Sequence, residues 1–261
     1  MSEPLLEIRN LEVAFGGVVA LSGVDLTLHR GEILAVIGPN GAGKTTVFNC
    51  VSGLYRPRQG SILFKGRDIQ GTPPHRVAAM GIARTFQNIE LFGHMSTVDN
   101  LLLGRHLHMR TGVLSGMGLL SRFSPAAREE LRHRERVEEI IDFLELEAVR
   151  GMPVASLPYG KRKVVELGRA LAMEPEVLLL DEPVAGMNLE ERQDMMIWVK
   201  DIQEVLGISI LLIEHDMKLV SDLADNVVVL NHGVRIAEGP PAVVQVDPEV
   251  VRAYLGEEAL A

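Results

Sequence analysis

The sequence predicts an α/β fold: a mostly parallel sheet, an antiparallel β layer near the N-terminus and a helical lobe in the middle. Three observations support this fold class. The apolar run Ile33–Ile37 is followed by a glycine-rich loop and a helix-like segment, as in parallel sheets that pack on helices. Apolar strands and amphipathic helices alternate in the final third of the chain. Residues 97–172 are mostly helical in pattern.

Short alternating strands precede the loop. Leu5–Phe15 and Val24–His29 have strand patterns, and the glycine-containing pairs Gly16–Gly17 and Ser22–Gly23 separate them. Gly60–Phe64 has the same pattern after the loop helix. We expect these segments to form the antiparallel layer.

The final third supplies the rest of the sheet. Val177–Leu180 and Ile208–Ile213 are apolar enough for buried parallel strands, and Leu189–Leu206 between them is helical in pattern. Asn226–Ala237 predicts a hairpin that turns around a His-Gly pair. Two short helical stretches follow over Pro240–Leu255.

The lobe and the tail define the expected domain organisation. Gly104–Pro125 is glycine-rich and irregular, whereas Pro125–Glu147 predicts one amphipathic helix whose mixed charges face solvent. We expect a single domain over residues 1–256 with the helical lobe, about 88–173, inserted in it. Residues 240–261 form the expected C-terminal helical tail.

The loop after the first buried strand has a specific chemistry. Its sequence, GPNGAGKT over Gly38–Thr45, fits G-x-x-x-x-G-K-[ST] between a strand and a helix. Its glycines let backbone N–H groups converge on phosphate oxygens, Lys44 adds a charge for the β and γ phosphates, and Thr45 can ligate Mg²⁺. A plain glycine-rich turn is the alternative interpretation. The residues expected to bind nucleotide here are Gly38, Pro39, Asn40, Gly41, Ala42, Gly43, Lys44, Thr45 and Thr46.

Two carboxylates follow the apolar strand that begins at Val177. In phosphate-loop enzymes an acidic residue at this point holds Mg²⁺, here Asp181 through a water, and a second carboxylate can orient or deprotonate the attacking water, here Glu182. An acidic pair that caps a helix is the alternative interpretation.

Composition excludes several classes of protein. The net charge of −9 disfavours nucleic acid as a partner. The N-terminus has no apolar core of a signal peptide, and no window approaches the roughly 18 apolar residues of a membrane span. The single cysteine, Cys50, suits a reducing compartment. We therefore expect a cytoplasmic chain without a membrane span.

With these motifs in place, the chain resembles the ATP-binding subunits of ABC transporters from Leu5 to Gly256. The resemblance implies that Phe15 stacks on adenine, that Gln87 contacts the metal site and relays nucleotide state, and that His215 contacts the γ-phosphate. Without it, Phe15 could be a core aromatic and His215 an ordinary surface histidine. Lys44, Glu182 and His215 are the implied catalytic residues, with Thr45, Gln87 and Asp181 around the metal.

One family motif is altered. Where the family usually has L-S-G-G-Q before a helix, this chain has LPYGK, so that Pro158 replaces a serine that donates to the partner's γ-phosphate and also lacks an N–H. Losing one hydrogen bond to a charged group costs about 1.5 to 3 kcal/mol. We expect a weakened signature made of Leu157, Pro158, Tyr159, Gly160 and Lys161.

Longer strings narrow the resemblance to one branch. FGGVVAL, GIARTFQNIELFGHMSTVDNLL, EPVAGMN, IEHDMKLV and VVRAYLGEE are similar to the ATPase subunits of high-affinity branched-chain amino-acid importers. Urea or amide importers and a lipid exporter's ATPase share several of these strings. A soluble ABC ATPase outside transport is disfavoured, because this chain has one ATPase unit, no sustained heptads and a net negative charge.

The resemblance also implies partners. It implies a second ABC ATPase subunit, as a heterodimer or a homodimer, together with two integral membrane permease subunits and, indirectly, an extracytoplasmic solute-binding protein. ATP and Mg²⁺ are the implied ligands. The expected location is the cytoplasmic face of the cell membrane, where the chain is held through the membrane subunits.

Overall fold

The computed structural model describes residues 3–86, 89–109 and 125–258. The chain divides into two compact units. The first, called the sheet unit, comprises residues 1–87, 176–185 and 193–261, and the second, called the helical unit, comprises residues 88–175 and 186–192.

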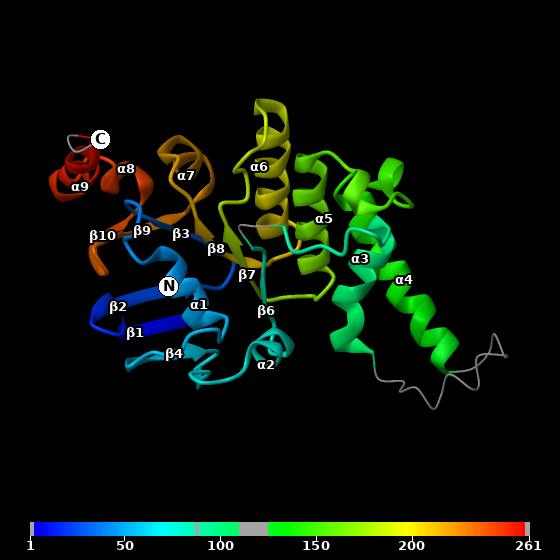
Figure 1. Ribbon diagram of the computed structural model, residues 1–261, viewed down its shortest axis with the longest axis horizontal. Coiled ribbons are helices and arrows are strands. Elements are labelled where there is room, and N and C mark those ends of the chain that lie inside the picture. Colours follow the sequence, from blue (N-terminus) through cyan, green and yellow to red (C-terminus); the bar gives the residue numbers. More distant parts are fainter. Residues whose placement is uncertain (1–2, 87–88, 110–124, 259–261) are drawn as a thin grey trace. The chain divides into compact units, whose positions relative to one another are not determined.

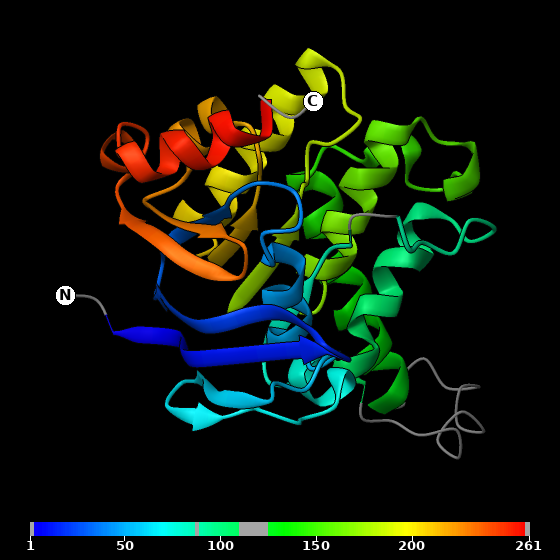
Figure 2. The same cartoon turned by 60° about the vertical axis from the view of Figure 1, so that its left-hand side comes forward.

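The N-terminal strands of the sheet unit form an antiparallel sheet of order β2-β1-β4-β5. Its strands are β1 (Pro4–Phe15), β2 (Val18–His29), β4 (Gln59–Phe64) and β5 (Arg67–Asp68). Figure 2 shows β1 and β2 running alongside each other. The predicted break at Ser22–Gly23 is wrong: β2 continues through it, because Gly23 adopts a φ of 67° and register shifts in the pairing with β1 absorb the irregularity.

A second sheet forms the core of this unit, in the order β10-β9-β3-β8-β7-β6. Its strands are β3 (Ile33–Ile37), β6 (Ile82–Arg84), β7 (Val177–Asp181), β8 (Ser209–Ile213), β9 (Asn226–Asn231) and β10 (Val234–Gly239). All pairs are parallel except the hairpin of β9 and β10. Every residue of β3, β7 and β8 is buried, as expected for strands covered on both faces. The predicted fold class is confirmed.

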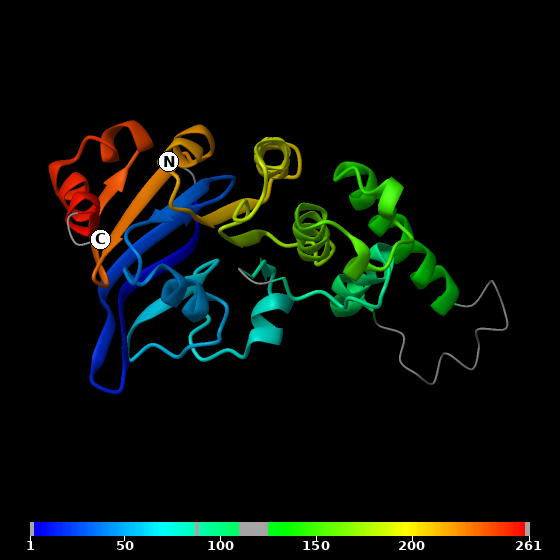
Figure 3. The same cartoon turned by 45° about the horizontal axis from the view of Figure 1, so that its top comes forward.

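The described part of the sheet unit also contains the helices α1 (Lys44–Val51), α2 (Pro74–Ala79), α7 (Met217–Leu223), α8 (Pro241–Val244) and α9 (Pro248–Glu258), together with α6 (Leu189–Glu204) from residue 193 onward. The pattern did not predict α7. It is a seven-residue helix that Asp216 caps by accepting hydrogen bonds from the N–H groups of Lys218 and Leu219. The tail helices α8 and α9 contact the hairpin of β9 and β10 (Figure 3).

In the part of the helical unit that the structure describes, three helices pack together. They are α3 (Thr97–Gly104), α4 (Pro125–Phe143) and α5 (Tyr159–Leu171), with short 3₁₀ turns at Arg105–His108, Glu147–Val149 and Val154–Ser156. Figure 1 shows α3 beside α4 and α5, and each pair is in contact. Ser96 caps α3 by accepting from the N–H of Asp99. The sequence predicted that the helix beginning at Pro125 would reach Glu147. This helix, α4, stops at Phe143, and Glu145 then has a left-handed φ of 52°.

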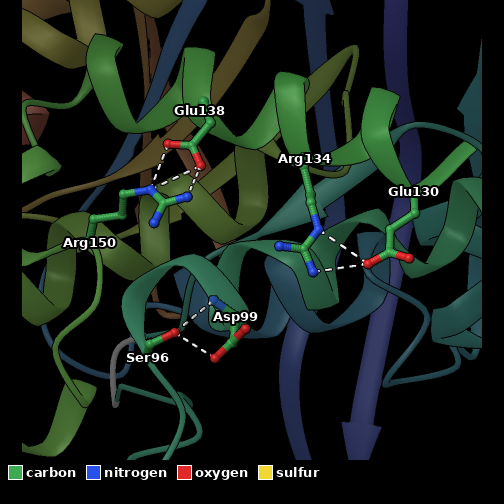
Figure 4. A network of polar contacts seen from close by, with 6 residues as sticks. All are labelled: Ser96, Asp99, Glu130, Arg134, Glu138 and Arg150. Atoms are coloured by element: carbon green, nitrogen blue, oxygen red, sulfur yellow. Dashed lines mark hydrogen bonds and ion pairs between the residues drawn. The ribbon is translucent and has the colours of Figure 1, made fainter. Parts of the chain in front are cut away.

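The charged face of α4 lies in solvent, as predicted. Figure 4 shows Glu130 paired with Arg134 one turn later and Glu138 paired with Arg150. These side chains are between 38 % and 55 % exposed, so water screens each pair and neither adds much to the stability of the fold. Among the described residues, no helix is long and apolar enough to cross a bilayer.

Candidate nucleotide site

The glycine-rich loop lies between β3 and α1, where the backbone must take conformations that favour glycine. Gly38, Gly41 and Gly43 have φ values of 143°, 77° and 103°. A Cβ added at Gly38 would lie 2.0 Å from the carbonyl oxygen of Leu230, and one at Gly43 would lie 2.6 Å from Leu21. The first and last of these glycines are therefore required by packing as well as by the turn. At Gly41 a Cβ would meet nothing within 4 Å.

Lys44 begins α1 and turns back over the loop. Its Nζ donates to the carbonyl oxygens of Gly38 at 2.5 Å and Pro39 at 2.9 Å, and the residue is only 8 % exposed. The N-terminus of α1 and this ammonium concentrate positive charge on one loop, which suits an anionic ligand such as a phosphate chain. Thr45 is exposed and Thr46 half-buried in the first turn of α1.

Asp181 and Glu182 lie where β7 ends. Asp181 is the last residue of the strand and is 2 % exposed. Its Oδ2 lies 3.0 Å from Nη2 of Arg84, a residue that the sequence pattern did not single out. Glu182 has a left-handed φ of 48°, and its N–H donates to the carbonyl oxygen of Ile213. The backbone thus turns sharply between the two carboxylates, which directs them differently.

His215 follows the neighbouring strand β8 and approaches Glu182. Its Nδ1 lies 3.9 Å from Oε1 of Glu182 and 3.9 Å from Oε2 of Glu214, and its side chain is 63 % exposed. Because β7 and β8 are parallel neighbours, their carboxyl ends place these groups together. The structure therefore brings together Glu182 and His215, two of the three predicted catalytic residues.

Glu214 is a further carboxyl that the sequence analysis missed. Its side chain is 1 % exposed, and burial raises its pKa to about 7, with the negative charge of Glu182 acting in the same direction. Its Oε2 accepts a hydrogen bond from the N–H of His215, whereas its Oε1 has no hydrogen-bond partner in the described part of the chain. The signal was an acidic residue directly after an apolar strand.

Phe15 ends β1 with its ring open to solvent. The residue is 48 % exposed, so a role as a core aromatic is excluded. Its ring packs edge-on against Tyr55, with centroids 5.0 Å apart and an interplanar angle of 70°. An exposed aromatic face held in this way is suited to stack on a planar base. Tyr55 carried no sequence signal of its own.

The signature stretch lies in the helical unit, at the start of α5. Pro158 is the N-cap residue and gives no side-chain hydrogen bond. Tyr159 is 39 % exposed and Lys161 is half-buried, whereas Leu157 is buried. Gly160 is tightly packed, since an added Cβ would lie 2.2 Å from Oε1 of Glu191.

Glu191 also holds the loop that precedes α6. Its Oε2 accepts from the N–H of Asn188, and its own N–H donates to Oδ1 of Asn188, both at 3.0 Å. A Cβ at Gly186 in the same loop would lie 2.9 Å from the ring of Tyr159. Residues 186–192 and the signature therefore pack against each other within the helical unit.

The donor groups fit Mg²⁺. A threonine hydroxyl at Thr45 and a carboxylate at Asp181 are hard oxygen donors, and Mg²⁺ is typically bound by one or two protein oxygens together with substrate phosphates. The described residues contain no group of three His, Cys, Asp or Glu side chains that could form an all-protein metal site. Gln87, the third predicted residue at the metal, lies outside the described residues.

Comparison with known proteins agrees with this site. The family described as ABC transporter matches residues 21–185, and the family described as branched-chain amino acid ATP-binding cassette transporter matches residues 234–259. The chain is 40 % identical to the high-affinity branched-chain amino acid transport ATP-binding protein BraF of Pseudomonas aeruginosa. The match covers 98 % of this chain and 100 % of that protein. The chain is 42 % identical, with the same coverage, to the corresponding protein LivG of Escherichia coli.

Solved structures agree as well. The chain is 31 % identical to an ATP-binding cassette of an ABC transporter in its ADP conformation, with a TM-score of 0.84 over 98 % of this chain and 100 % of that one. The protein therefore belongs to the ATP-binding, ATP-hydrolysing subunits of ABC transporters. Within that family it belongs to the branch of ATP-binding proteins of branched-chain amino acid transport, and the resemblance inferred from its motifs is confirmed.

Proposed function

We propose that this chain hydrolyses ATP at the cytoplasmic face of the membrane to drive import of branched-chain amino acids. The observation that carries the proposal is the match to the branched-chain family at residues 234–259, joined to 40 to 42 % identity over nearly the whole chain. The ends of β7 and β8 support the proposed ATP hydrolysis, since they bring Oε1 of Glu182 and Nδ1 of His215 to 3.9 Å from each other.

In this proposal the chain's residues act mainly by positioning and electrostatics. The loop amides and Lys44 stabilise charge on the transferring phosphoryl group. Thr45 and Asp181 would hold Mg²⁺, with Gln87 as a third contact, and such an ion would supply positive charge for the phosphate oxygens. Glu182 accepts a proton from the attacking water, and His215, which is open to solvent, donates to the γ-phosphate.

We further propose that two ATPase subunits close face to face, with each ATP between one chain's phosphate loop and the other chain's signature. The N-terminus of α5 supports this role, because Tyr159 and Gly160 keep N–H groups there although Pro158 has none. A partner that supplies an ordinary signature to this chain's loop would leave the two sites unequal. Two membrane subunits and an extracytoplasmic binding protein complete the proposed complex.

The test is ATP hydrolysis by the complex rebuilt in lipid with its membrane subunits and binding protein. The ligand panel contains leucine, isoleucine and valine, other amino acids, urea and short amides. Stimulation by the branched aliphatic amino acids is the expected result. Stimulation only by another ligand would keep the ATPase and reject the proposed cargo, and failure to assemble with any membrane subunit would reject the transport role.

A further inference from the structure

Arg84 lies at the end of β6 and joins three elements of the sheet unit. Its side chain is 8 % exposed, and Nη2 lies 3.0 Å from Oδ2 of Asp181, whose side chain is 3 % exposed. Its other terminal nitrogen, Nη1, donates to Oδ1 of Asn49 at 2.7 Å and to Oγ of Ser52 at 3.2 Å. One guanidinium therefore connects β6 and β7 to α1, the helix that follows the phosphate loop.

Two aromatic rings fix the guanidinium between these partners. Its Cζ lies 5.5 Å from the ring centroid of Phe48 and 5.1 Å from that of Phe86. Its Nε is buried and makes no hydrogen bond with any described residue. The planar group thus has a defined orientation, with one edge toward Asp181 and the other toward the end of α1.

Fold stability does not explain this arrangement. A buried ion pair is often no more stabilising than apolar residues of the same volume, because desolvation offsets the attraction. The unpaired Nε adds a further cost. Rigid orientation of a carboxylate is what such a pair supplies, since Arg presents a fixed fork of donors that Lys cannot reproduce.

We infer that Arg84 is a positioning residue that fixes the carboxylate of Asp181 relative to α1, which it holds at the last turn. This inference rests on the proposed function, in which Asp181 on β7 and Thr45 on α1 hold Mg²⁺. Arg84 binds Asp181 on β7 through Nη2 and Asn49 on α1 through Nη1. It therefore sets the position of the two proposed metal ligands, Asp181 and Thr45, relative to each other. Its contribution belongs to the metal-dependent part of nucleotide binding.

The test compares nucleotide affinity with and without metal. Binding of a fluorescent ATP analogue is titrated in Mg²⁺ and in EDTA, with Glu182→Gln as background to prevent turnover. Arg84→Gln should lower the Mg²⁺-dependent gain in affinity at least about tenfold, the effect of losing one hydrogen bond to a charged group. Affinity in EDTA should stay within about twofold. The Mg²⁺-dependent gain of Arg84→Lys should lie between that of the background protein and that of Arg84→Gln. The control Arg67→Gln, at an exposed position, should have the same gain as the background protein.

Two measurements keep the inference separate from the function beneath it. Asp181→Asn should abolish the Mg²⁺-dependent gain, and a background protein that shows no such gain would reject the proposed metal site itself. A full gain in Arg84→Gln, or an equal loss in Mg²⁺ and EDTA, would overturn the positioning role. Thermal unfolding shows whether Arg84→Gln folds. If it does not, Arg84→Lys is used in its place, and a full Mg²⁺-dependent gain in the affinity of Arg84→Lys would also overturn the inference.

Discussion

Glu214 should make the stability of the protein depend on pH in a way that one substitution removes. The carboxyl is buried and its pKa is about 7, against an ordinary value of 4.5. Below pH 4.5 it is protonated in both the folded and the unfolded chain. As the pH rises toward 7, the unfolded chain loses this proton first, so the folded state loses stability relative to the unfolded state.

The size of the effect follows from the difference between the two pKa values. One pH unit corresponds to about 1.4 kcal/mol for a single group, so this carboxyl should cost the folded protein about 3 kcal/mol above pH 7.5. Glu214→Gln removes the titration but keeps an oxygen that can accept from the N–H of His215. The variant should therefore gain about 3 kcal/mol over the wild type at high pH and nearly nothing at pH 4.

The assay is urea unfolding of the wild type and the variant at several pH values between 4 and 8.5. Only the difference between the two proteins is used, because titration of the groups that do not interact with Glu214 then cancels. Glu204→Gln is the matched control, since the side chain of Glu204 is 62 % exposed. If the free energies of unfolding of Glu214→Gln and wild type run parallel across this range, the carboxyl does not titrate near pH 7 and the argument from burial fails.

Three further predictions concern the site. Glu182→Gln should nearly abolish ATP hydrolysis in the assembled transporter while nucleotide affinity stays within about threefold, because the side chain activates water rather than binds phosphate; a rate close to the wild type would exclude it as the base. Pro158→Ser should raise turnover or leave it unchanged, and a loss comparable to that of Glu182→Gln would reject the asymmetry of the two sites. Gly38→Ala should lower the free energy of unfolding by about 3 kcal/mol or more, because its Cβ would meet the carbonyl oxygen of Leu230 at 2.0 Å. Gly66→Ala, with φ 70° and nothing within 4 Å, isolates that clash from the strain of a positive φ.

The parallel core was predictable because its signals are local. A strand buried on both faces must be apolar throughout, and β3, β7 and β8 are such runs. Parallel strands then bring their carboxyl ends to one edge, which explains the 3.9 Å approach of Glu182 and His215. Glu182 was expected from its place directly after an apolar strand, whereas His215 was expected only from the family resemblance.

Features with distant or compensated causes were not predictable. Arg84 and Asp181 are 97 residues apart in sequence, and neither stretch alone indicates the pair. The Ser22–Gly23 step looked like a strand break, but β2 accommodates a left-handed Gly23 through shifts in its pairing with β1. The helix α7 is only seven residues long, too short for a periodic pattern, although its cap at Asp216 was a usable signal.

Because the signature and residues 186–192 pack against each other, a change in one of these stretches requires a matching change in the other. Exchanging LPYGK for the common L-S-G-G-Q would replace Tyr159 by glycine and remove the ring that lies over Gly186. The new glycine pair would leave Gly186 uncovered, while Gly160 would still have to fit beside Glu191. A chimera that restores the usual signature should therefore also carry the donor's loop before α6. When two family members differ in the signature, their residues corresponding to 186–192 should be compared as well.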